Sequence, residues 1–189
     1  MRAMPDMTVL SPVDETELIA MMDWAQAYDG PVYLRIVRDA VPDVFGADYT
    51  FTPGAVHRLR QGADVALVST GPQVSRVLAA ADLLADQGVA ATVVHVPSIK
   101  PLDEDGLRDS LADQHLVVTV EEHSVMGGLG GLVAEVLTAH GPSPRIERIG
   151  IDDVWGESAG NDFMLTKHGL SPELISQRVQ SALATRVPS

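Results

Sequence analysis

The chain has 189 residues, of which 46% are hydrophobic and 21% charged, so it can bury a core and is not disordered by composition. The net charge of −13 argues against nucleic-acid backbone binding, and the lack of cysteine excludes disulfides, thiolate catalysis and cysteine-ligated metals. No apolar run is long enough for a membrane span, and residues 1–12 lack the long apolar segment of a signal peptide. We therefore expect a soluble cytoplasmic protein with no nucleic-acid or membrane partner.

The first part of the chain predicts a strand, a helix and a second strand. A short strand over residues 8–10 precedes a helix that begins after Asp14, a plausible N-cap, and runs to about Tyr28. A second strand is predicted over 32–38. Such a β-helix-β unit cannot bury its own faces, so it must dock on something larger. Residues 39–62, which include several prolines and glycines, are predicted to be an irregular linker across the surface.

From Gly62 onward the pattern alternates between strands and helices. The predicted strands cover 63–69, 91–96, 116–120 and 145–150, and the predicted helices cover 73–87, 103–111, 162–168 and 172–184, with a further glycine-rich helix after the third strand. This alternation predicts an α/β fold with a mostly parallel sheet and helices on both faces. The expected organisation is a tail of a different domain over 1–40, a linker over 41–62 and a doubly wound domain over 63–189.

Function is most expected where the buried strand over 116–120 ends. Glu121, Glu122 and His123 stand there, and ligands often bind at the carboxyl ends of strands in such folds. The three side chains are candidates for acid-base catalysis. Because neighbouring strand residues point to opposite faces, at most two of them share a side. An interface, or a hydrogen-bonded cap for neighbouring loops, is therefore the favoured alternative.

Two glycine patterns invite functional interpretations that their contexts oppose. The run that follows the strand contains Gly127, Gly128 and Gly130, but a dinucleotide fingerprint that starts at Gly128 would end at Val133 instead of a glycine. Close packing of a helix is the simpler explanation for these glycines. The G-x-S-x-G pattern around Ser158 matches the nucleophile elbow of hydrolases, but no buried strand precedes it.

Arg35 and Arg38 lie three residues apart near the end of a predicted strand, and hence on opposite faces. An arginine at a strand end can grip a phosphate bidentately. A salt bridge to one of the many carboxylates is an equal alternative on spacing alone. The six histidines show no metal-binding spacing, so no metal site is expected on this chain.

Taken together, these segments resemble the transketolase family. Residues 2–12 with 14–17 and 30–38 resemble the end of its pyrimidine-binding domain. Three further stretches resemble its C-terminal domain: residues 63–71, residues 120–123 with 127–130, and residues 155–160 with 168–170. Related thiamine enzymes share this layout, namely 1-deoxy-D-xylulose 5-phosphate synthase and the beta subunits of 2-oxo acid dehydrogenases. The resemblance covers nearly the whole chain through the order of its segments.

The resemblance implies thiamine diphosphate chemistry with Mg²⁺ in the assembled enzyme. The family's G-D-G motif and the later N-N pair are absent, and its catalytic glutamate lies upstream of Met1. No catalytic, cofactor-binding or metal-binding residue is therefore expected on this chain. Arg38 matches the arginine that binds the sugar-phosphate substrate. The C-terminal domain mainly supports the dimer in this family, which places Glu121, Glu122, His123 and the nearby glycines at an interface or at the periphery of the active site.

The expected protein is the C-terminal part or subunit of a transketolase-like enzyme that transfers a two-carbon ketol unit between sugar phosphates. A partner chain would carry the diphosphate-binding domain and the catalytic glutamate, within a homo- or hetero-oligomer. The alternatives are a non-catalytic module for dimerisation or regulation, a subunit of a related thiamine enzyme, and an esterase that uses Ser158.

Overall fold

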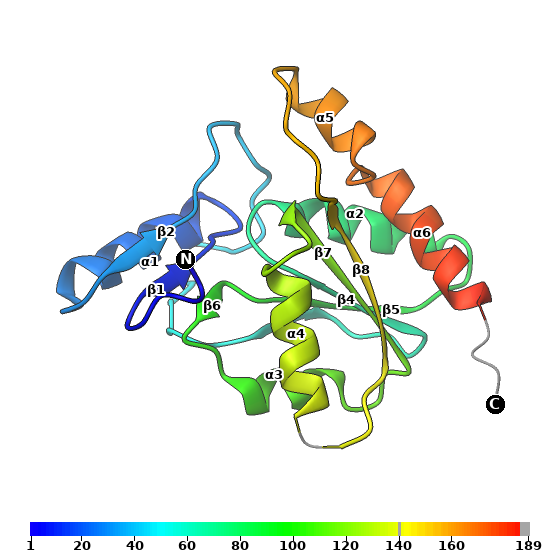
Figure 1. The fold of residues 1–189 in the computed structure, drawn as a ribbon, viewed down its shortest axis with the longest axis horizontal. Helices are drawn as coiled ribbons and strands as arrows, with labels where there is room; N and C mark the ends of the chain where they lie inside the picture. The colour runs from blue at the N-terminus through cyan, green and yellow to red at the C-terminus, as the bar shows by residue number, and fades with distance from the viewer. Residues whose placement is uncertain (140, 186–189) are drawn as a thin grey trace.

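The computed structural model describes residues 1–139 and 141–185, and within these it contains a three-stranded and a five-stranded sheet (Figure 1). His140 and residues 186–189, which belong to the domain predicted over 63–189, lie outside the described residues. The mostly parallel α/β architecture with helices on both faces is confirmed.

The N-terminal β-α-β unit consists of β1 (Thr8–Leu10), α1 (Glu15–Ala27) and β2 (Val32–Leu34). Asp14 is the N-cap of α1, as predicted, because its side chain accepts a hydrogen bond from the Glu17 N–H. Within the unit β1 pairs in parallel with β2. The unit docks on the rest of the same chain, since β1 also pairs antiparallel with β6 (Ser98–Lys100). Leu10, Met21 and Phe51 form its small buried core.

The larger sheet has the strand order β3-β5-β4-β7-β8. Its strands are β3 (His57–Arg60), β4 (Val65–Ser69), β5 (Ala91–His95), β7 (Leu116–Ser124) and β8 (Arg145–Ile151). The last four run parallel, while β3 pairs antiparallel with β5 at the edge. The centre is apolar and buried on both faces, as expected for parallel strands that helices cover.

Helices cover both faces of this sheet (Figure 1). On one face α2 (Gln73–Ala85), α5 (Asn161–Lys167) and α6 (Pro172–Ala184) pack over one set of strand residues. On the other face α3 (Glu104–Leu111) and α4 (Leu129–Thr138) pack over the alternate set. The alternation along β4 shows why, since Leu67 faces the first group of helices and Val68 the second.

Four predictions about the secondary structure are wrong. The strand predicted over 116–120 continues to Ser124, so Glu121, Glu122 and His123 lie within it. The strand predicted over 32–38 ends at Leu34, so Arg35 and Arg38 follow a strand rather than lying in one. The irregular stretch predicted over 39–62 contains β3, a polar edge strand held by its pairing with β5. The stretch left irregular between the predicted strand over 91–96 and the predicted helix over 103–111 contains β6, which forms where β1 lies beside it. No helix among the described residues is both long enough and apolar enough to cross a bilayer.

Candidate functional site

The end of β7 places Glu121 beneath the start of α4. The residue is 1% exposed, and its two carboxylate oxygens accept hydrogen bonds from the Leu129 N–H at 2.8 Å and the Gly130 N–H at 2.9 Å. A carboxylate at this position satisfies N–H groups that a helix start leaves without partners. Burial raises the pKa of Glu121, and the two backbone hydrogen bonds partly oppose that rise. Glu121 is thus a hydrogen-bonded cap for α4.

Glu122 and His123 make contacts that differ from those of Glu121, although all three residues line the same cavity, described below. The Glu122 carboxylate lies 3.1 Å from an Arg76 guanidinium nitrogen on α2, and the Glu122 carbonyl accepts a hydrogen bond from Arg35 at 2.5 Å. His123 is exposed, and its Nδ1 lies 2.7 Å from the Ser124 carbonyl oxygen and 3.8 Å from a Glu121 oxygen. Glu121 and His123 therefore share one side of β7, while Glu122 points to the other.

The glycines after β7 allow the close approach of α4 to this strand. A Cβ atom on Gly128 would lie 1.8 Å from a Glu121 carboxylate oxygen, and one on Gly130 would lie 2.7 Å from the Thr119 Oγ1. Gly127 has a φ of +73°, which non-glycine residues rarely adopt. Each glycine has a steric or conformational explanation, so the run needs no bound phosphate to account for it.

A cavity of about 290 Å³ separates the end of β7 from the N-terminal unit. It lies outside the carboxyl ends of β4 and β7, at the point where the strand order reverses direction. Its polar lining includes Arg35 and all three predicted residues, Glu121, Glu122 and His123. Ser11 also lines it, and the Ser11 hydroxyl is buried without a hydrogen-bond partner among the described residues. The cavity combines these polar groups with apolar side chains from both units.

Arg38 lies elsewhere, in residues 35–56 between β2 and β3. It is exposed, and no side-chain hydrogen bond or ion pair of its guanidinium occurs in the described part of the chain. It lines a second cavity, of about 350 Å³, that shares no lining residue with the first. Four carboxylates also line this cavity: Asp14, Glu15, Asp39 and Asp43. The structure therefore does not bring Arg38 together with the Glu121 cluster.

A buried polar network that sequence reasoning missed lies next to this second cavity. Glu17 is 0% exposed, and its Oε2 lies 2.8 Å from Nε2 of the equally buried His95. Its Oε1 accepts a hydrogen bond from the Tyr49 hydroxyl at 2.6 Å. The spacing of Asp14 and Glu17 matches the capping-box pattern, which predicts that the glutamate turns back toward the helix start. The sequence could therefore have indicated that Glu17 turns back toward the helix start. It could not have identified Tyr49 and His95 as its partners.

The serine motif does not form a hydrolase site. Ser158 lies in an exposed, irregular segment, residues 152–160, between β8 and α5. Asp162 and His168 lie at opposite ends of α5, and among the described residues no hydrogen bond joins either of them to Ser158. A nucleophile, a base and an orienting acid must be within hydrogen-bond reach of one another. The G-x-S-x-G motif therefore does not form a catalytic triad among the described residues.

The residues present do not fit a magnesium-bound diphosphate. Among the described residues there is no group of three or more histidine, aspartate or glutamate side chains arranged to hold a metal ion. The chain also lacks the G-D-G and N-N motifs. We therefore assign no residue of this chain to a metal or to thiamine diphosphate, and place no chemical step on it.

Comparison with known proteins identifies the family. Residues 54–175 match the family described as "Transketolase, C-terminal domain". The chain is 39% identical over 89% of its length to one subunit of the apulose-4-phosphate transketolase of Actinobacillus succinogenes, covering 54% of that protein. It is 38% identical over 97% of its length to the 1-deoxy-D-xylulose-5-phosphate synthase of Symbiobacterium thermophilum, covering 28%. This chain belongs to the transketolase C-terminal domain family.

A solved structure extends the similarity to the N-terminal unit. The match to a structure described as "Split gene transketolase, inactive beta4 tetramer" has a TM-score of 0.91 and 42% identity, and covers 97% of this chain and 60% of that one. The chain spans about half the length of the curated relatives it matches first.

Proposed function

We propose that this chain is the C-terminal portion of a thiamine diphosphate enzyme of the transketolase type, which transfers a two-carbon ketol unit between sugar phosphates. The observation that carries the proposal is the match, over 97% of this chain, to a split-gene transketolase. A relative that is itself named as a transketolase subunit supports the same assignment. A partner chain would supply the diphosphate-binding domain with thiamine diphosphate and Mg²⁺, and the assembly would operate in the cytoplasm.

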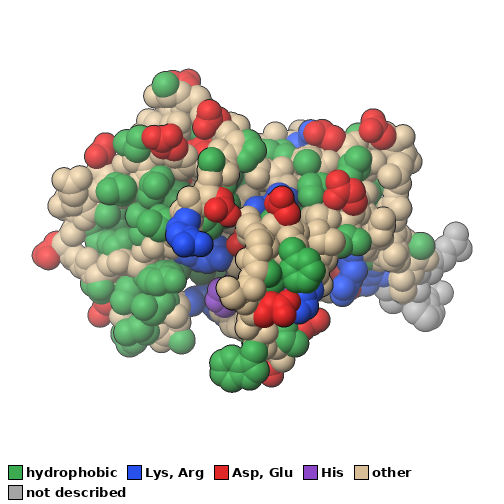
Figure 2. Space-filling view, turned by 90° about the horizontal axis from the view of Figure 1, so that it is seen from above, with side chains coloured by type: hydrophobic (Ala, Val, Ile, Leu, Met, Phe, Trp, Pro, Cys, Tyr) green, Lys and Arg blue, Asp and Glu red, His purple; other side chains and the backbone are tan. Residues whose placement is uncertain are grey.

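The proposed organisation is a pyrimidine-binding domain tail over residues 1–40, a connection over 41–62 and the C-terminal domain over 63–189. The N-terminal unit has features of an unfinished domain. β2 is an edge strand, and α1 exposes Ile19 and Met22 at 52% and 50%. Figure 2 shows apolar side chains gathered over this end of the molecule. Apolar side chains that are exposed together commonly mark an interaction surface, so further polypeptide would cover this end in the complete enzyme.

Arg38 is the residue we propose to bind the phosphate of the sugar phosphate. Its guanidinium is exposed at a 350 Å³ cavity, and no partner for it occurs among the described residues. The planar fork of an arginine suits a phosphate because it can donate two parallel hydrogen bonds. The neighbouring carboxylates would repel a free anion. Phosphate binding at this cavity would therefore depend on further groups that the partner brings.

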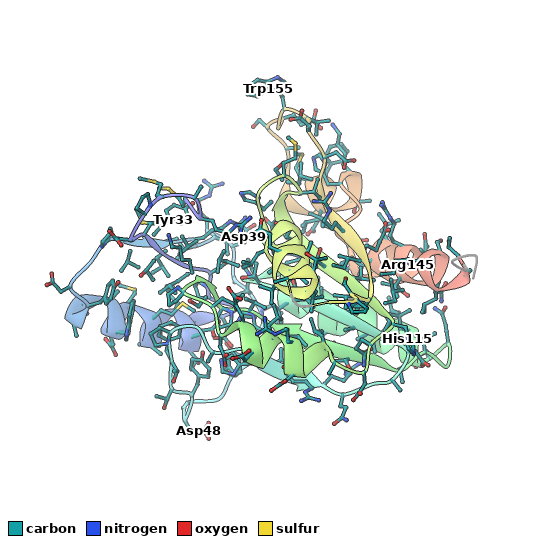
Figure 3. All side chains as sticks on the ribbon, turned by 60° about the horizontal axis from the view of Figure 1, so that its bottom comes forward. Tyr33, Asp39, Asp48, His115, Arg145 and Trp155 are labelled. Carbon is teal, nitrogen blue, oxygen red and sulfur yellow. The ribbon has the colours of Figure 1, made fainter. Side chains whose placement is uncertain are left out.

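The 152–160 loop is a second candidate contact with the partner. Trp155 stands at its tip, pointing away from the body of the molecule, and is 99% exposed (Figure 3). Val154 and Phe163 are exposed nearby at 57% and 58%. Aromatic residues are enriched at the centres of protein interfaces, and their exposure in water is unfavourable. The end of β7, from Glu121 to Gly130, would form part of an interface or of the periphery of the active site.

The test is to purify the tagged chain from its native cells and assay the complex with ribose 5-phosphate as acceptor. The proposal predicts recovery of a chain with a diphosphate-binding domain, and ketol transfer by the complex. Arg38→Ala should raise the KM for the sugar phosphate about a hundredfold, with Arg38→Lys intermediate because the charge remains without the fork. Arg60→Ala, which removes a surface pair with Asp82, is the matched control. A complex without ketol transfer would contradict the proposal.

The alternative is a non-catalytic, self-associating module. The similar solved structure is described as an inactive β4 tetramer, which favours a subunit that assembles with its own copies. That alternative predicts a stable homo-oligomer with no chain bearing a diphosphate-binding domain among its partners. The match to 1-deoxy-D-xylulose-5-phosphate synthase keeps that related reaction open, and an assay with pyruvate and glyceraldehyde 3-phosphate distinguishes it.

A further inference from the structure

Residues 35–56, all of them described, connect β2 to β3 without a helix or strand and carry Arg38. A long irregular connection is normally among the mobile parts of a fold unless side chains elsewhere hold its backbone. Two carboxylates in and just before the first turn of α1 make such contacts. They belong to Asp14 and Glu17, which are 3% and 0% exposed.

Asp14 holds the middle of this connection. One carboxylate oxygen accepts hydrogen bonds from the backbone N–H groups of Val44 and Phe45, both at 2.8 Å. The other oxygen accepts the N-cap hydrogen bond from the Glu17 N–H at 2.8 Å. A carboxylate suits this position because both of its oxygens only accept hydrogen bonds. Asp14 therefore couples the start of α1 to a point six residues beyond Arg38.

Glu17 holds the connection at a second point. Its Oε1 accepts the Tyr49 hydroxyl, while its Oε2 accepts the Val13 N–H at 2.7 Å and contacts His95 on β5. The Tyr49 ring stacks on Phe45, with 4.2 Å between the ring centroids. The connection is thus held by hydrogen bonds near its middle and by an aromatic stack that joins the two points.

The hydrogen bonds of Asp14 and Glu17 do more than fill the space between α1 and residues 35–56. Burying a carboxylate is unfavourable, and well-packed apolar residues often close such an interface at lower cost. What charged acceptors add is direction, because each oxygen fixes the position of a particular N–H or O–H group. The backbone that they fix carries Arg38, and Asp14 lines the same 350 Å³ cavity as Arg38.

We propose that Asp14 and Glu17 are positioning residues for sugar-phosphate binding. By holding residues 35–56 against α1 they keep the Arg38 guanidinium at the cavity, and a shift of the connection would reshape the wall that Asp14 shares with it. The inference rests on the proposed role of Arg38.

The experiment compares Asp14→Ala and Glu17→Gln with Asp103→Ala in the full chain assembled with its partner. Asp103 is the N-cap of α3, and its side chain accepts the Gly106 N–H at 2.9 Å. Its backbone N–H donates to the Gly54 carbonyl at 2.9 Å, and Asp103→Ala keeps this bond, so the variant loses an N-cap of the same type while this backbone contact with residues 35–56 stays. Amide hydrogen exchange reports on Val44 and Phe45, and steady-state kinetics separates KM from kcat for ribose 5-phosphate.

Asp14→Ala and Glu17→Gln should each accelerate exchange in residues 39–56 and raise the KM about tenfold, with kcat changed by less than about threefold. Asp103→Ala should leave both readouts unchanged. Faster exchange with an unchanged KM would overturn the positioning role. If Asp14→Ala does not fold, Asp14→Asn replaces it, since an amide oxygen can serve only one of the two groups of donors.

Arg38→Ala separates the two proposals. If it raises the KM while neither carboxylate variant does, the positioning inference fails and the proposed role of Arg38 stands. If Arg38→Ala leaves the KM unchanged, the proposed role of Arg38 fails, and the positioning inference fails with it.

Discussion

The Glu121 carboxylate accepts the Gly130 N–H at 2.9 Å across the turn between β7 and α4, with no space left for a side chain at Gly128. A carboxylate on one strand thereby caps the helix that follows it. The relationship explains why a buried acid and a run of glycines occur together, and it makes the packing of this turn testable.

Gly128→Ala should destabilise the chain by about 1–3 kcal/mol, because the new Cβ would displace the Glu121 carboxylate from the start of α4. Gly131→Ala is the matched control. Its nearest neighbour would be an Arg2 nitrogen at 3.6 Å, so alanine should be neutral or stabilising by up to about 1 kcal/mol within α4. Urea unfolding at neutral pH measures both effects, and equal effects for the two variants would contradict the packing account.

The stability of the wild type relative to Glu121→Gln should fall as the pH rises. Burial raises the folded-state pKa of Glu121 above its ordinary value of 4.5, so between these two pKa values the folded state binds more protons than the unfolded state. Well below 4.5 both states are protonated and the difference is constant. Urea unfolding of both proteins from about pH 4 to about pH 7 tests this. A difference that stays constant or grows in favour of the wild type would show that the pKa is not raised.

His57 should make the protein less stable as the pH falls. Burial is the main cause that lowers the pKa of His57 below 6.5; the charge of His95 adds to this effect and that of Glu17 opposes it. The folded state therefore binds fewer protons than the unfolded state from about pH 6.5 down to the lowered pKa, and stability present above 6.5 is lost on acidification. His57→Gln should reduce this loss. A His57 titration at or above pH 6.5, followed by NMR, would disprove it.

Trp155 should report partner docking through its fluorescence. The chain has two tryptophans, and Trp24 is half-buried against Tyr28 with 4.5 Å between ring centroids. In Trp24→Phe the emission therefore comes from Trp155 alone, which is 99% exposed. Addition of the partner should shift this emission to the blue and protect it from acrylamide quenching. A stable complex with unchanged emission would place the 152–160 loop outside the interface.

The alternation of strands and helices was predictable because parallel strands buried on both faces are continuous apolar runs. β4 and β7 are examples. β3 was not predictable in this way, since its sequence His-Arg-Leu-Arg is polar and its backbone pairs with β5 at a sheet edge. β6 has three residues between two prolines and depends on β1, which lies far away in sequence.

The candidate sites were also predictable only where the signal is local in the sequence. The capping role of Asp14 is local and was predicted from its position before α1. The contact of Glu17 with His95 joins residues 78 positions apart, and no local pattern pairs them. Arg38 was singled out through the family resemblance rather than through its spacing, and its cavity arises from the tertiary arrangement around residues 35–56.

The most direct test of the central claim is isothermal titration of thiamine diphosphate with Mg²⁺ into the purified chain, first alone and then mixed with the partner that carries the diphosphate-binding domain. We predict no binding by the chain alone, because its described residues do not fit a magnesium-bound diphosphate, and binding in the mixture that is tighter than to the partner by itself. Tight binding by the chain alone, or a mixture that binds no better than the partner, would contradict the account.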